Sequence, residues 1–188
     1  MANAKNTTIE KTPQGFLLAK RHIIDAALAG GIGWGMLGGL AGTMLMDLML
    51  IGAFMIAGLP AFTCFSLVGE TVEHLFTLLG VEMTGGVLLG VSVHYLIGPL
   101  IGAIFGAVVA RFPALRTGTL KKCLILAVLY VEVLSQPLLA LAPLLLKMTQ
   151  TEILEWYGGS FVMHFILGII LGTVVSHGLR LASAASHK

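Results

Sequence analysis

Four long stretches of this sequence carry almost no charge, and they restrict the chain to one kind of structure. They span residues 30–59, 86–110, 122–146 and 158–181. Each is at least as long as the roughly 20 apolar residues that an α-helix needs to cross a ~30 Å hydrocarbon core. Only 11% of the 188 residues are charged, whereas a soluble domain carries about 25%. The sequence therefore predicts an all-α protein that spans the lipid bilayer four times.

The first stretch is too long for one helix perpendicular to the membrane and too short for two. We therefore expect its helix to tilt or to extend past one face of the bilayer. Residues 1–22 precede it as a polar cytoplasmic tail that lacks the apolar core of a secretory signal. Residues 23–188 then form a single transmembrane domain. After the first span, residues 65–79 have the pattern of an amphipathic helix that lies on the outer surface.

The positive charges divide the loops into two sets. Ten of the eleven Lys and Arg residues fall in the N-terminal tail, between the second and third spans, or near the C-terminus: Lys5, Lys11, Lys20, Arg21, Arg111, Arg116, Lys121, Lys122, Arg180 and Lys188. The other two loops carry Lys147 and an excess of glutamate. Because cytoplasmic loops are rich in Lys and Arg, we expect a multi-pass protein of the cytoplasmic (inner) membrane with both termini in the cytoplasm. The basic residues do not form the surface of a nucleic-acid-binding protein.

A histidine begins the same short pattern in the second and the fourth span. Residues His94 to Gly98 read His-Tyr-Leu-Ile-Gly, and residues His164 to Gly168 read His-Phe-Ile-Leu-Gly. The preceding span in each half of the chain also holds one carboxylate. These matches predict a four-helix bundle made of two helical hairpins, repeated in parallel about an axis along the membrane normal. A chance similarity between two glycine-rich hairpins is the alternative.

Glycines and other small residues recur every four positions in the first, second and fourth spans. This spacing lets the backbones of two membrane helices approach closely, so helix packing is one interpretation of the pattern. The other interpretation is a slot for a flat cofactor, in which Gly98 and Gly168 leave room beside the two histidines.

Ionisable residues inside a span are costly and often functional. Asp47, Glu132, His94 and His164 lie within the predicted spans, and both histidines fall in the outer half of the bilayer. One interpretation is structural, with each histidine bonded to a neighbouring helix. The other is a binding or relay site.

Three chemistries fit these four residues. His94 and His164 are able to hold one b-type haem between them, which favours a subunit of an electron-transfer complex. Asp47, Glu132 and the two histidines also suit a proton or ion relay in a small transporter or channel. Histidine with nearby methionine would favour copper, but the sequence defines no metal-ligand set.

The run from Gly38 to Asp47 reads GGLAGTMLMD, and the segment Gly58-Leu-Pro60 follows it. Together with the acidic outer loop and the His-Tyr-Leu-Ile-Gly segment, this run resembles a family of small prokaryotic polytopic membrane proteins, most of them of unknown function. The resemblance covers most of the chain. It implies a four-helix prokaryotic membrane protein and contributes no catalytic residue.

We expect an integral membrane subunit that is structural or accessory in a larger complex, with other membrane subunits or further copies of the chain as partners. Haem b is the cofactor that an electron-transfer role would require. The transporter or channel is the alternative function and requires no cofactor. Enzymatic turnover is the least favoured function.

Overall fold

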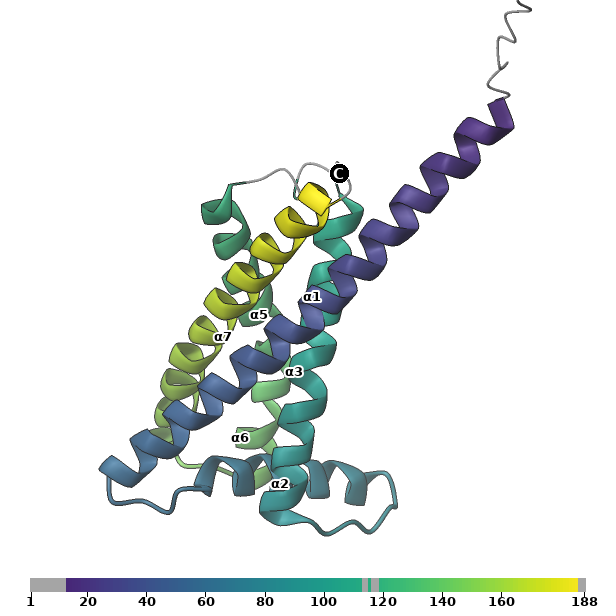
Figure 1. Cartoon of the computed structure of the whole chain (residues 1–188). Helices are drawn as coiled ribbons and strands as arrows, with labels where there is room; N and C mark the ends of the chain where they lie inside the picture. The colour runs from purple at the N-terminus through teal and green to yellow at the C-terminus, as the bar shows by residue number, and fades with distance from the viewer. Residues whose placement is uncertain (1–12, 113–114, 116–118, 186–188) are drawn as a thin grey trace, which may run out of the picture.

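The computed structural model describes residues 13–112, 115 and 119–185, and these residues are helical apart from short connections. The helices, shown in Figure 1, are α1 (Pro13–Ile56), α2 (Thr63–Leu78), α3 (Gly86–Arg111), α5 (Leu120–Leu139), α6 (Leu141–Leu146) and α7 (Gln150–Ala185). Residues 1–12 of the predicted tail lie outside the described residues, as do Arg116 and Lys188 from the charge pattern.

Four apolar helical stretches are long enough to cross a membrane. They are Asp25–Ile56, Gly86–Arg111, Leu120–Leu146 and Gln150–Ala182. Their positions agree with a multi-pass membrane protein. The fourth begins earlier than predicted, because the polar residues from Gln150 onward continue the helix of the last span.

Helix α1 is continuous over 44 residues, which makes it about 66 Å long at 1.5 Å per residue. This length is more than twice the ~30 Å thickness of a hydrocarbon core. Residues 13–22, predicted as part of a polar tail, extend the helix of the first span instead. Figure 1 shows the N-terminal part of α1 running well past the ends of the other helices. The helix therefore extends beyond one end of the bundle.

The third apolar stretch is divided into α5 and α6, which meet at Ala140. Pro143 has no backbone N–H, so the carbonyl of Leu139 lacks its usual partner within the helix. The indole Nε1–H of Trp156 donates a hydrogen bond to this carbonyl at 3.0 Å. Trp156, near the start of α7, thus stabilises the break in the third stretch.

Glycines set the distances between the long helices. Helices α1 and α3 meet at three glycine pairs in which an added Cβ would contact the backbone of the facing helix: Gly31–Gly106, Gly35–Gly102 and Gly39–Gly98. A second edge of α1 packs against α7, and α7 packs against α5, through four further glycines: Gly38, Gly42, Gly168 and Gly172. The packing interpretation of the glycine pattern is therefore confirmed at these positions.

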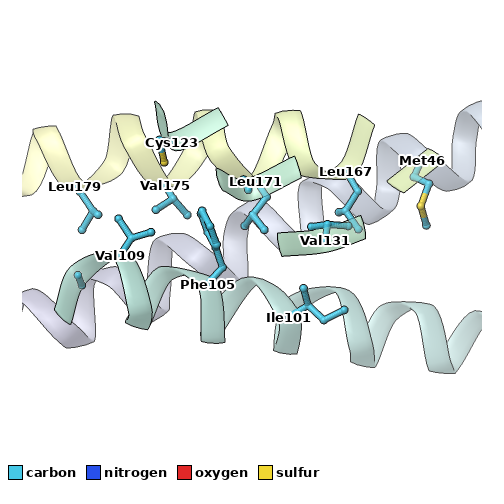
Figure 2. Packing of buried hydrophobic residues seen from close by; sticks show 12 residues of the cluster. Met46, Ile101, Phe105, Val109, Cys123, Val131, Leu167, Leu171, Val175 and Leu179 are labelled. Atoms are coloured by element: carbon cyan, nitrogen blue, oxygen red, sulfur yellow. The ribbon is translucent and has the colours of Figure 1, made fainter. Parts of the chain in front are cut away.

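Helix α1 lies between α3 and α7, and α7 packs along α5. Helices α3 and α5 meet mainly through side chains, with the rings of Phe105 and Tyr130 5.3 Å apart and the Tyr130 hydroxyl donating to the carbonyl of Ile101 at 3.1 Å. Figure 2 shows Phe105 in the buried apolar cluster with Leu171 and Val175 of α7. The two interfaces between the hairpins therefore differ, because α3 and α5 do not approach as closely as α1 and α7 do.

Helix α2 lies across the start of α3 (Figure 1). Its bounds, Thr63–Leu78, confirm the helix predicted over residues 65–79. An added Cβ at Gly69 would contact the carbonyl of Gly86, and one at Gly90 would contact the carbonyl of Phe65. These contacts bring the two backbones together at the N-terminal end of α3.

A carboxylate from α2 caps the first turn of α3. Oε1 of Glu73 accepts hydrogen bonds from the backbone N–H groups of Gly85 and Gly86 at 2.6 and 2.7 Å. These donors lower the pKa of Glu73 below its ordinary value, because they stabilise the charged carboxylate. A negative charge at this position also complements the helix dipole. Glu73 therefore fixes α2 to α3.

Candidate functional site

Asp47 and His94 come together from two different helices. Asp47, on α1, is only 4% exposed, and its Oδ1 lies 2.9 Å from Nδ1 of His94 on α3. At this distance Nδ1–H donates a hydrogen bond to the carboxylate, and protonation of the ring turns the contact into an ion pair. The close contact of Gly39 with Gly98 holds the two helices near enough for this bond.

The pair lies well inside the apolar stretches. His94 follows the start of α3 at Gly86 by eight residues, or about 12 Å, and Asp47 precedes the end of α1 at Ile56 by nine residues, or about 14 Å. Both side chains therefore lie away from either end of their helices. This is the depth at which an ionisable group is costly unless it is paired or functional.

The first turn of α2 covers the pair. The ring of Phe65, which is 2% exposed, meets the His94 ring edge-on with the centroids 5.2 Å apart. Burial raises the pKa of the neighbouring Cys64 thiol to about 12, and the charge of Asp47 contributes to this rise. Phe65 and Cys64 thus shield the pair from water, which strengthens the electrostatic interaction within it.

Two oxygen atoms beside the pair are buried and have no hydrogen-bond partner among the described residues. They are Oδ2 of Asp47 and Oγ1 of Thr43. Thr43 precedes Asp47 by one helical turn and lies against Gly98. Because buried polar atoms usually have partners, the site has spare hydrogen-bonding capacity. Oδ2 is able to accept a proton, and the hydroxyl is able to donate to or accept from a polar ligand.

The other two predicted residues, His164 on α7 and Glu132 on α5, belong to the second half of the chain. His94 lies close enough to His164 for an electrostatic interaction. Oε1 of Glu132 is buried without a hydrogen-bond partner among the described residues, and Nδ1 of His164 is buried with only the nearby backbone of Ser160 to interact with. Oε2 of Glu132 accepts a long hydrogen bond of 3.5 Å from Gln136 on its own helix. The structure therefore brings Asp47 and His94 into contact but shows no hydrogen bond between Glu132 and the other three.

Neither glycine predicted to make room for a haem has open space beside it. A Cβ added at Gly98 would contact Oγ1 of Thr43, and one added at Gly168 would lie 2.6 Å from Cα of Val128. Both positions are filled by the neighbouring helix, so these two glycines provide no slot for a macrocycle. The described residues contain no group of three or more His, Cys, Asp or Glu side chains placed to hold a metal ion.

The sequence analysis did not identify Phe65 and Cys64 as part of the site. The only signal for them was the pair of small residues at the N-terminal end of α3, Gly86 and Gly90, which allows a crossing helix to approach. An amphipathic helix in the preceding loop was the element available to cross there.

Searches against protein-family models, curated proteins and solved structures find no match to this chain. The resemblance to a family of small polytopic membrane proteins gains no support from them. The functional proposal therefore rests on the geometry of the site.

Proposed function

We propose that this chain is a small proton-linked membrane transporter or channel, or the proton-carrying subunit of one, in which Asp47 and His94 bind the proton. The 2.9 Å contact between Oδ1 of Asp47 and Nδ1 of His94 carries this proposal. It joins a carboxylate and an imidazole, the kinds of side chain that form proton relays inside membranes, and it does so within an apolar stretch.

A structural role alone accounts less well for this pair. Hydrogen bonds between membrane helices stabilise by only about 0.6 kcal/mol on average, and apolar residues of similar volume often replace a buried ion pair without loss of stability. Helices α1 and α3 already meet at three glycine pairs. The pair is therefore not needed to hold these helices together, whereas Oδ2 of Asp47 retains the capacity to take up a proton.

The test measures proton flux into vesicles. Purified protein is reconstituted with a pH-sensitive dye inside the vesicles, and a potassium diffusion potential drives proton entry. We expect wild-type protein to acidify the lumen and Asp47→Asn to reduce the flux to the level of protein-free vesicles. Asp25→Asn is the matched control, because Asp25 is an exposed carboxylate on the same helix. Undiminished flux through Asp47→Asn, or no flux through wild type, would contradict the proposal.

The alternative is an accessory subunit of an electron-transfer complex with one b-type haem between His94 and His164. The electrostatic proximity of the two imidazoles favours it, and the filled space beside Gly98 and Gly168 weighs against it. A dithionite-reduced minus oxidised spectrum of protein expressed with haem available separates the two functions. A sharp α-band at near-stoichiometric haem supports the cytochrome, and a flat spectrum leaves the proton-linked function.

A further inference from the structure

The contact between Asp47 and His94 follows from the way their two helices cross. Gly98 of α3 lies against Thr43 of α1. His94 precedes Gly98 by four residues, and Asp47 follows Thr43 by four residues. Four residues are slightly more than one helical turn. Because α1 and α3 run antiparallel, the two steps lead in the same direction along the interface, and the acid and the histidine meet.

The same arrangement recurs between α5 and α7. Gly168 of α7 lies against Val128 of α5, and one turn further on Gly172 lies against Leu124. This pair of contacts fixes the register of the two helices, which run side by side in Figure 1. One turn in the other direction, Glu132 follows Val128 by four residues and His164 precedes Gly168 by four residues. Glu132 and His164 therefore occupy the positions in the second hairpin that Asp47 and His94 occupy in the first.

The hydrogen bonds of this second set of residues are incomplete. Oε1 of Glu132 is buried and has no hydrogen-bond partner among the described residues. Nδ1 of His164 is also buried and makes no hydrogen bond of ordinary geometry there, although the backbone of Ser160, one turn earlier on α7, lies near enough to interact with its ring. A carboxylate oxygen accepts hydrogen bonds and an imidazole N–H donates them, so Nδ1–H of His164 is able to donate to Oε1 of Glu132. Buried polar atoms without partners are uncommon. Two complementary ones at the same level of one helix interface indicate a pair that is open in this conformation.

We infer that Glu132 and His164 form a second proton-binding pair, equivalent to Asp47 and His94, whose hydrogen bond closes by side-chain rotation in another state of the protein. The role of this pair in a proton path rests on the proposed function. The existence of the hydrogen-bonded pair does not depend on that function. His94 lies within electrostatic range of His164. The two pairs would therefore act as neighbouring sites, one on each hairpin.

Nitrogen NMR of histidine tests the pair without any measurement of transport. The full-length protein, with ¹⁵N-labelled histidine, is placed in lipid nanodiscs, and the ring signals of His94 and His164 are assigned from His→Gln variants. We expect Glu132→Gln to shift the His164 signals far more than those of His94. Asp47→Asn should do the reverse. Glu155→Gln, at an exposed carboxylate on α7, should shift neither.

An unchanged His164 signal in Glu132→Gln would overturn the inference, and so would equal shifts at both histidines, which would indicate a long-range effect of the charge. Loss of flux in Asp47→Asn with no response of His164 to Glu132→Gln would leave the proposed function standing without the second pair. Undiminished flux in Asp47→Asn together with a shift of the His164 signals in Glu132→Gln would show that the second pair forms but that the proposed transport function is wrong.

Cysteine cross-linking tests the register if Glu132→Gln does not fold. Glu132→Cys and His164→Cys are combined in a chain whose Cys64 and Cys123 are replaced by serine. Residues whose Cα atoms are more than about 7 Å apart do not form a disulfide. We expect oxidation in membranes to protect both thiols from a polyethylene-glycol maleimide. The pair Glu132→Cys with Phe161→Cys, on an exposed position of α7, should remain reactive; protection of this control alone would overturn the register.

Discussion

At the scale of single residues, the environment of Cys64 shows how α2 covers the site. Cys64 lies in the first turn of α2, beside the buried Phe65 and within range of the Asp47 charge. From the sequence we would place this cysteine in an outer loop and expect it to be accessible. The structure leaves it only partly exposed instead, because α2 packs its first turn against α3 rather than lying free on the surface.

Cys64 should therefore react slowly with thiol reagents. Burial raises its pKa to about 12, so very little thiolate exists at pH 7.5. The lower thiolate fraction outweighs the higher nucleophilicity of a more basic thiolate. We expect N-ethylmaleimide to label Cys64 at least about a hundredfold more slowly than an unperturbed thiol of pKa ~8.5, with the rate rising as the pH is raised toward the pKa.

The measurement uses a Cys123→Ser variant in nanodiscs, so that Cys64 is the remaining thiol, and follows labelling by mass spectrometry. The same protein unfolded in detergent is the reference. Equal rates in the folded and unfolded protein would show that α2 does not cover the site as described.

The residue pairing itself was only partly foreseeable. The sequence identified Asp47, His94, Glu132 and His164 because each is ionisable within an apolar stretch. It did not show that Asp47 bonds to His94, because that contact depends on which glycines of α1 and α3 face one another. Spacing within each helix does not determine the register between two helices.

At the scale of helices, α1 and α3 are held together by contacts between backbones. Gly102 faces Gly35, and an added Cβ at either residue would contact the carbonyl of the other. By contrast, a Cβ added at Gly33 of α1 has no neighbour within 4 Å. The same substitution should therefore have opposite effects at these two positions.

We expect Gly102→Ala to destabilise the protein by about 1–3 kcal/mol, because a backbone carbonyl has no freedom to move aside. Gly33→Ala should be neutral or stabilise by up to about 1 kcal/mol, because alanine favours the helix more than glycine does. Reversible unfolding in mixed micelles, followed by circular dichroism, measures both. Equal stability of the two variants would show that α1 and α3 do not meet at Gly102.

Sequence patterns predicted the existence of the elements better than their ends. Residues 65–79 gave α2 almost correctly, since its amphipathic pattern is bounded by turns on both sides. The first and last spans were predicted too short, because hydropathy marks where a helix crosses lipid and not where it ends. The break at Ala140 depends on Pro143 and on the hydrogen bond from Trp156, which belongs to another helix.

At the scale of the whole molecule, the fold is compatible with either orientation across the membrane, and the distribution of charge predicts which orientation the protein adopts. The loop between α2 and α3 carries the exposed Glu82, whereas the exposed Lys121 begins α5 at the opposite end of the bundle. The excess of Lys and Arg at the second end predicts that it faces the cytoplasm.

Introduced cysteines at exposed positions test this orientation, because the native Cys64 is only partly exposed. Glu82→Cys and Lys121→Cys are made separately in a chain whose two native cysteines are replaced by serine. A membrane-impermeant maleimide applied to intact cells should label the first and not the second. Labelling of the second alone would reverse the topology.

The central position of α1 also constrains the order in which the chain is assembled. One glycine edge of α1 packs on α3, which is synthesised soon after α1, but the other packs on α7, which follows the other described helices in the sequence. Until α7 has been synthesised, Gly38 and Gly42 therefore lack the partner helix that covers them in the structure. A chain truncated before α7 would leave this small-residue edge of α1 uncovered, whereas the folded protein covers it.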